Sequence, residues 1–293
     1  MNPNSCPLYA GIAGINLKVD EFDFGQGIIL RKTYAHIMAP YLAAFAPAEK
    51  GKHHPAPWKA VSGGMGFDIQ AELYIPIEFT LPDWFDRINT IWWFAALMRL
   101  KASILVSVPV IANKPFAEIP QSKEEPYFWP IEMRPSRLVP VDNPSQEINE
   151  SDLLWIRNNW VSGGALMNKN SEFNVAFQAI DACIWSHSPS LALVSLWGAL
   201  ERLFSPSHYE LCFRVSAIIA SYLEIPGEER LSLYRRVKKL YDARSKAAHG
   251  SPIEDNKSLL ETYALLKRAL VKMIEENHVP SHEELEALLF GAG

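Results

Sequence analysis

The chain has little cysteine, no long hydrophobic run and no excess of positive charge. Its three cysteines, Cys6, Cys183 and Cys212, are odd in number and lack metal-ligand spacing, which argues against a disulfide framework or a cysteine zinc site. The longest apolar stretch, around residues 91–97, is too short to cross a bilayer, and the N-terminus lacks a signal-peptide pattern. We therefore expect a cytoplasmic protein in a reducing compartment, without a membrane partner.

Motifs that bind phosphate through a glycine-rich loop, or metal through clustered carboxylates, are also missing from the sequence. Metal-assisted hydrolysis is therefore short of ligands, and we expect neither a metal nor another cofactor. The formal net charge of −5 gives no global signal for nucleic acid, so any basic patch has to be local.

The 293 residues, of which 48% are hydrophobic, suffice for one large or two ordinary domains. Residues 1–150 predict a mixed, β-rich domain in which proline and glycine separate short stretches of strand character. The predicted strands lie within residues 11–19, 67–79, 103–112 and 131–139. In the second, apolar and polar residues alternate, and Pro76 predicts a sheet edge or bulge. Residues 84–101 predict a helix, residues 33–45 a second helical piece, and residues 47–66 a surface loop.

Residues 151–293 predict an all-helical domain, so the fold class is α+β, with a boundary near residues 144–151. A first short helix is expected over residues 153–161, ended by Gly163 and Gly164. The helices that follow are expected at residues 172–186, 190–204, 209–223, 228–248, 255–277 and 281–289. Short connections predict antiparallel neighbours.

Three arginines are followed by a histidine five or six residues later: Arg31 by His36, Arg202 by His208, and Arg244 by His249. This spacing arises by chance in a chain of this composition, so the context has to choose among the pairs. Arg31 and His36 lie in a short mixed segment, and Pro206 separates the second pair. Only Arg244 and His249 close an amphipathic helix.

Arg244 lies on or beside the apolar stripe of that helix, four residues after Leu240 and three after Tyr241. A guanidinium there needs a partner or a ligand, because an unpaired buried charge is costly. Gly250 is the expected residue after the helix end, so His249 is placed at the terminus. The histidine then turns back towards the arginine or faces a second subunit.

The run from Tyr241 to Gly250 resembles the signature of HEPN domains, specifically the ApeA-like branch, and the match extends upstream to residues 196–204. The resemblance covers about residues 171–277 and not the N-terminal half. It implies that Arg244 and His249 are the catalytic pair of a nuclease. Ser245 fits the polar residue that usually follows the arginine. It also implies a homodimer through the helical domain, in which two motifs share one cleft.

Glu201 is the second informative residue, because it lies on the central helix at positions that face inward and should demand a cation. We predict a Glu201–Arg244 ion pair that fixes the guanidinium; the alternative is a salt bridge that only locks the bundle. The motif helix also carries seven basic residues against one acidic residue between positions 230 and 246. This face predicts either phosphate binding or an ordinary solvated surface. The residues assigned to RNA binding are Lys246, Lys239, Arg236 and Arg214.

These observations predict a metal-independent endoribonuclease of HEPN type, in which the 2′-OH of the RNA is the nucleophile. Histidine exchanges protons near neutral pH, so His249 serves as general base or acid. Arg244 stabilises charge on the phosphorus oxygens, Ser245 bonds a phosphate oxygen or orients His249, and Glu201 orients Arg244. By analogy alone, the N-terminal domain senses a regulatory partner or a phage-derived trigger in antiviral defence. The alternatives are a non-catalytic HEPN module that binds RNA or a nucleotide, and the toxin half of a toxin–antitoxin pair.

Overall fold

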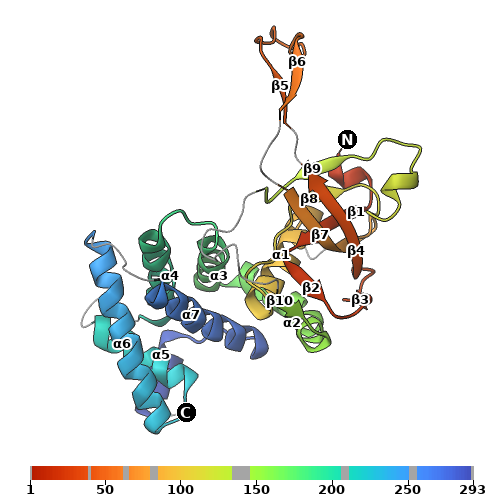
Figure 1. The fold of residues 1–293 in the computed structure, drawn as a ribbon. Helices are drawn as coiled ribbons and strands as arrows, with labels where there is room; N and C mark the ends of the chain where they lie inside the picture. Colours follow the sequence, from red (N-terminus) through yellow and green to blue (C-terminus); the bar gives the residue numbers. More distant parts are fainter. Residues whose placement is uncertain are drawn as a thin grey trace.

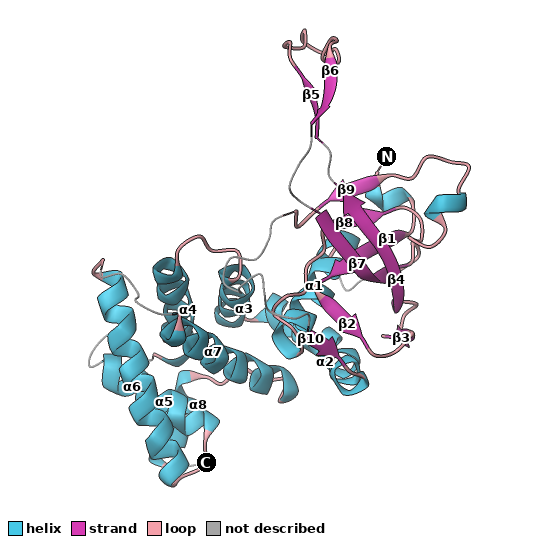
Figure 2. Cartoon of the chain, in the orientation of Figure 1, coloured by secondary structure: helices cyan, strands magenta, loops and turns pink. Residues whose placement is uncertain are grey.

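A computed structural model describes residues 2–38, 41–61, 66–79, 85–133, 146–205, 211–250 and 256–291. An N-terminal β-sheet region is followed by a helical C-terminal region, so the predicted α+β class is confirmed (Figure 1 and Figure 2). The strands are β1 (Leu8–Ala13), β2 (Ile15–Leu17), β3 (Glu21–Asp23), β4 (Ile29–Met38), β5 (Tyr41–Ala44), β6 (Trp58–Val61), β7 (Gly66–Ile75), β8 (Val110–Ala112), β9 (Phe128–Pro130) and β10 (Gln146–Ile148). Short 3-10 helices cover Pro3–Ser5 and Ile119–Gln121.

The main sheet is antiparallel, with the order β3-β4-β7-β1-β8-β9. Its strand β7 shows the predicted alternation, since Ile69, Ala71, Leu73 and Ile75 are all buried. The prediction that Pro76 marks a sheet edge is wrong: β7 lies between β4 and β1, and the strand ends before the proline. Strands β10 and β2 form a separate parallel pair, and β5 and β6 form a hairpin.

The helical piece expected at residues 33–45 is wrong, because this segment belongs to β4 and β5. From Ala35 to Met38 the chain pairs with β7, and successive side chains of β4 alternate between half-buried and exposed. Pairing with a distant strand therefore determines the secondary structure of a short stretch whose apolar pattern suits a helix or a strand. The loop expected at residues 47–66 is interrupted by β6. Of the strand expected at residues 103–112, only residues 110–112 form a strand, which is β8. Most of the strand expected at residues 131–139 lies outside the described residues.

Helix α1 (Arg87–Lys101) is capped by Asp86, while the predicted start at residue 84 falls outside the described part of the chain. Helix α2 (Glu150–Lys169) begins after Asn149 and continues through Gly163 and Gly164, so the predicted helix end there is wrong. A Cβ on Gly163 would lie 3.0 Å from the Trp93 ring of α1. The glycine therefore permits close packing of α2 on α1.

The remaining helices agree closely with the predicted ranges: α3 (Ser171–Cys183), α4 (Pro189–Phe204), α5 (Leu211–Leu223), α6 (Glu228–Ala248), α7 (Lys257–Glu275) and α8 (His282–Phe290). The apolar stripe of α3 is buried as its helical period predicts. Asn170 ends α2 and also caps α3, where its side chain accepts a hydrogen bond from the backbone N–H of Phe173. In the described ranges, no helix has the length and hydropathy needed to span a membrane.

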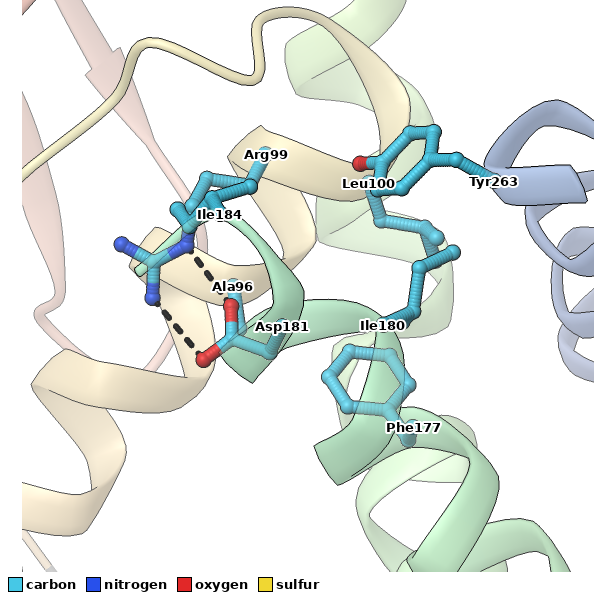
Figure 3. A pocket seen from close by; sticks show the side chains of 8 residues that line it. All are labelled: Ala96, Arg99, Leu100, Phe177, Ile180, Asp181, Ile184 and Tyr263. Carbon is cyan, nitrogen blue, oxygen red and sulfur yellow. Dashed lines mark hydrogen bonds and ion pairs between the residues drawn. The ribbon is translucent and has the colours of Figure 1, made fainter. Parts of the chain in front are cut away.

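A buried ionic cluster joins the sheet region to the helices. The guanidinium of Arg99 on α1 donates to Asp181 on α3, with a 2.7 Å contact from Nε to Oδ1 (Figure 3). It also donates to Glu132, beyond β9, at 3.2 Å. Trp92 also donates to Asp181, and the backbone N–H of Val108 donates to Glu132. The Arg99 side chain is 2% exposed, so the pairs are shielded from water.

Candidate functional site

The C-terminal end of α6 is formed as its sequence predicts. The helix ends at Ala248, His249 is the capping residue, and Gly250 follows with a φ of +85°. This left-handed conformation suits glycine because it has no Cβ. The backbone N–H of His249 donates to the carbonyl of Ser245, and the imidazole is exposed to solvent. The helix therefore ends at the point where His249 is exposed.

The predicted ion pair between Glu201 on α4 and Arg244 on α6 is confirmed. Arg244 Nη2 lies 3.0 Å from Glu201 Oε1 and donates to Oε2 at 3.1 Å. The two side chains are 25% and 18% exposed, so the pair is half-buried and remains open on one side. The Nε of Arg244 is buried without a hydrogen-bond partner among the described residues. The guanidinium is thus held in place and keeps an unused donor.

Two aromatic side chains form the support behind this pair. The Tyr241 ring lies 5.5 Å from the guanidinium carbon of Arg244, and the buried Trp197 meets Tyr241 edge to face at 5.2 Å. Burial raises the pKa of Tyr241, and the nearby Glu201 carboxylate raises it further. Both aromatics lie within residues 196–204 and 241–250, but their role is not predicted from the sequence. Their spacing, four residues before Glu201 and three before Arg244, was the available signal.

Arg244 and His249 are not brought together within one copy of the chain. Five helical residues rotate by about 140° beyond one turn, so the arginine faces the bundle while the histidine faces solvent. Among the described residues, no hydrogen bond or ion pair joins them. Ser245 is half-buried beside Arg244, and its carbonyl accepts from His249. A joint action of these side chains therefore needs a second copy or a bound ligand.

The basic residues of α6 gather on a different face from Arg244. Arg235, Arg236 and Lys239 line an open groove of about 520 Å³, together with Glu228, Leu231 and Ser232. Arg236 also forms an ion pair with Glu261 of α7, which satisfies part of its charge. Lys246 is exposed one turn before the helix end, whereas Arg214 on α5 is half-buried. The groove lies along the first half of α6, and Lys239, its lining residue nearest in sequence to His249, precedes that histidine by ten residues.

The other two arginine–histidine pairs form no joint site. Arg31 contacts Glu21 and Glu72, while His36 binds Asp68 at 2.7 Å. Arg202 pairs with Glu172 across 3.6 Å, and His208 lies outside the described residues.

Chemically, the end of α6 offers a restrained guanidinium and an exposed imidazole, and a basic groove lines the first half of the same helix. Comparisons with protein-family models, with curated proteins and with solved structures find no match for this chain.

Proposed function

We propose that the chain is a metal-independent endoribonuclease of HEPN type that acts as a homodimer through its helical region. The observation that carries the proposal is the Glu201–Arg244 pair, which holds a half-buried guanidinium in place near the helix end that exposes His249. A carboxylate that fixes an arginine preorganises it for charge that develops on a phosphate.

In the proposed reaction, one His249 takes the proton of the RNA 2′-OH, and the 2′ oxygen attacks the neighbouring phosphorus. A bond forms from phosphorus to the 2′ oxygen as the bond to the 5′ oxygen breaks. The His249 of a second copy gives a proton to the departing 5′ oxygen, so protons balance. Arg244 neutralises the negative charge of the crowded phosphorus in the transition state. The groove with Arg235, Arg236 and Lys239 holds the flanking phosphates.

The test is cleavage of single-stranded RNA by the purified chain in the presence of a chelator. His249→Ala is expected to lower the rate by about 10²-fold or more, as for loss of a positioned acid or base. Arg244→Ala is expected to lower it as strongly. His282→Ala and Arg202→Ala are matched controls on exposed helix positions and are expected to retain wild-type activity. DNA of the same sequence should resist, since it lacks the 2′-OH. Equal activity of His249→Ala and wild type would remove the enzyme hypothesis.

A mixing experiment tests the shared cleft. The proposed reaction needs the His249 of both copies, and a heterodimer of a wild-type chain with a His249→Ala chain has only one of them, so an excess of the His249→Ala chain should suppress the activity of the wild type. Sedimentation measured in parallel reports whether the chains associate. A monomer that cleaves at the wild-type rate contradicts the dimeric mechanism.

A non-catalytic RNA-binding module is the second candidate, favoured by the separation of Arg244 and His249 in one copy. In that case the RNA is bound and recovered intact. Binding that weakens in Arg244→Ala, without cleavage by the wild type at any enzyme concentration, selects this candidate.

A further inference from the structure

The hairpin of β5 and β6 projects away from the main sheet as an arm, which we define as residues 41–61 (Figure 1 and Figure 2). All four residues of β6 are exposed, and the side chains of Leu42, Phe45 and Trp58 are 64%, 65% and 54% exposed. A two-stranded hairpin is marginally stable by itself in water, and large exposed apolar side chains mark binding surfaces. The arm therefore presents a surface suited to a partner.

The register of the hairpin separates two faces. Leu42 lies opposite Ala60, and Ala44 lies opposite Trp58, so these side chains share one apolar face. Lys59 pairs with Ala43 and belongs to the other face. One face of the arm thus carries an apolar surface around the Trp58 ring, and Lys59 lies on the opposite face.

The Trp58 ring is fixed in spite of its exposure. Its indole N–H donates to the backbone carbonyls of His54 and Pro55, each at 3.0 Å. The His54 ring in turn bonds the carbonyl of Ala46 at 3.0 Å. With the polar atom of the indole already satisfied inside the loop, the free part is the aromatic surface. A restrained, exposed ring is a stacking platform for a base, because little freedom is lost on binding.

The charge of the arm identifies the kind of partner. The arm carries three lysines, Lys50, Lys52 and Lys59, against one acid, Glu49, in a chain whose net charge is −5. Glu49 is paired with Lys52, which leaves Lys50 and Lys59 without an ion pair in the described part of the chain. Positive charge on the same arm as a stacking ring fits a single-stranded nucleic acid.

A lipid bilayer fits the arm less well. Most of the other apolar positions are alanines, namely Ala43, Ala44, Ala46, Ala48, Ala56 and Ala60, whose small side chains gain little on insertion. The indole N–H that would bond a lipid headgroup is already tied to the loop.

We propose that the arm is a single-stranded RNA-binding element, in which Trp58 and Phe45 stack on bases while Lys50 and Lys59 contact phosphates. A role of the arm in holding the substrate for cleavage rests on the proposed nuclease function, but RNA binding by the arm is measured separately from cleavage. The arm lies apart from the end of α6, so it grips a part of the RNA strand away from the cleaved bond (Figure 1).

The test measures binding of a short fluorescein-labelled oligouridylate by fluorescence anisotropy, with the full chain carrying His249→Ala to prevent cleavage. Trp58→Ala is expected to weaken binding by about 5- to 150-fold, the range for loss of one stacked base. Trp58→Phe should retain most of the affinity, whereas Trp58→Leu, which is apolar but not aromatic, should lose it. Phe290→Ala is the control, because its ring is 82% exposed on α8. Circular dichroism checks that each variant is folded.

The two lysines give an independent readout. Lys50→Gln with Lys59→Gln should lower the slope of log affinity against log salt by about 1.4, since each phosphate contact on a single strand contributes about 0.7. Lys123→Gln with Lys169→Gln, at exposed positions outside the arm, should leave the slope unchanged.

Unchanged RNA affinity in Trp58→Ala overturns the proposal. So does Trp58-dependent binding to phosphatidylserine vesicles without an effect on RNA, or a Trp58-dependent dimer that binds RNA normally. If the wild type cleaves no RNA but binding still depends on Trp58, the nuclease function fails while the arm proposal stands. If cleavage depends on His249 and binding does not depend on Trp58, the arm proposal fails while the nuclease function stands.

Discussion

Loss of Arg99 should destabilise the whole protein, because this residue is the cation of the buried cluster. Arg99→Leu leaves Asp181 and Glu132 with only 10% and 15% of their side chains exposed and with no opposite charge. Removal of one partner from a buried ion pair costs about 3–5 kcal/mol. That is a large fraction of the roughly 5–15 kcal/mol that stabilises a typical folded domain.

Urea unfolding followed by tryptophan fluorescence and circular dichroism measures this loss. With a slope of about 2–3 kcal/mol per molar urea, the midpoint should fall by about 1–2.5 M. Arg99→Lys keeps the charge but not the forked geometry, so its urea midpoint should lie between those of the wild type and Arg99→Leu. The matched control is Arg202→Leu, whose ion pair with Glu172 is about half exposed and should contribute at most about 1 kcal/mol. Similar midpoints for Arg99→Leu and Arg202→Leu would refute the reasoning.

Three further predictions concern stability. Burial raises the pKa of Glu72, so wild-type stability should fall as pH rises from about 4.3, the ordinary glutamate pKa, through the raised folded-state value. Glu72→Gln lacks this fall, and a pH-independent difference between the two urea midpoints would contradict the assignment. Gly163→Ala should cost about 1–3 kcal/mol because its methyl group would lie 3.0 Å from Trp93, whereas Gly198→Ala, with open space at the helix surface, should be neutral or stabilising in thermal melts. Gly250→Ala should lower the melting temperature, since alanine is strained at a φ of +85°; an unchanged melt would show that the helix end adapts.

Helical periodicity carried much of what the sequence could predict. It placed Glu201 and Arg244 on inward-facing stripes of two helices, and the ion pair follows because each charge needs a partner at that depth. The end of α6 was predictable from Gly250, since the left-handed residue after a helix is usually glycine. These features depend on residues close together in the sequence or on a charge with few available partners.

Features that depend on distant segments were not predictable. Arg99 meets Asp181 and Glu132 across 82 and 33 residues, and no local pattern marks the three as a group. Gly163 resembles a helix terminator in sequence, but its role is set by Trp93 on another helix. The strands at residues 33–45 depend on pairing with β7. The orientation of His249 at the helix end was left open by the sequence, and in the structure this residue faces solvent, away from the Glu201–Arg244 pair.

The connection between α2 and α3 is a single residue, Asn170, and this limits how the two helices can move relative to each other. A linker of several residues would distribute a rotation between the two helices over many backbone torsions. Here any bend between these helices has to pass through the φ and ψ angles of one asparagine, whose side chain is already committed to Phe173. A rotation of α2 relative to α3 is therefore confined to the torsions of one residue, with no further linker to absorb it.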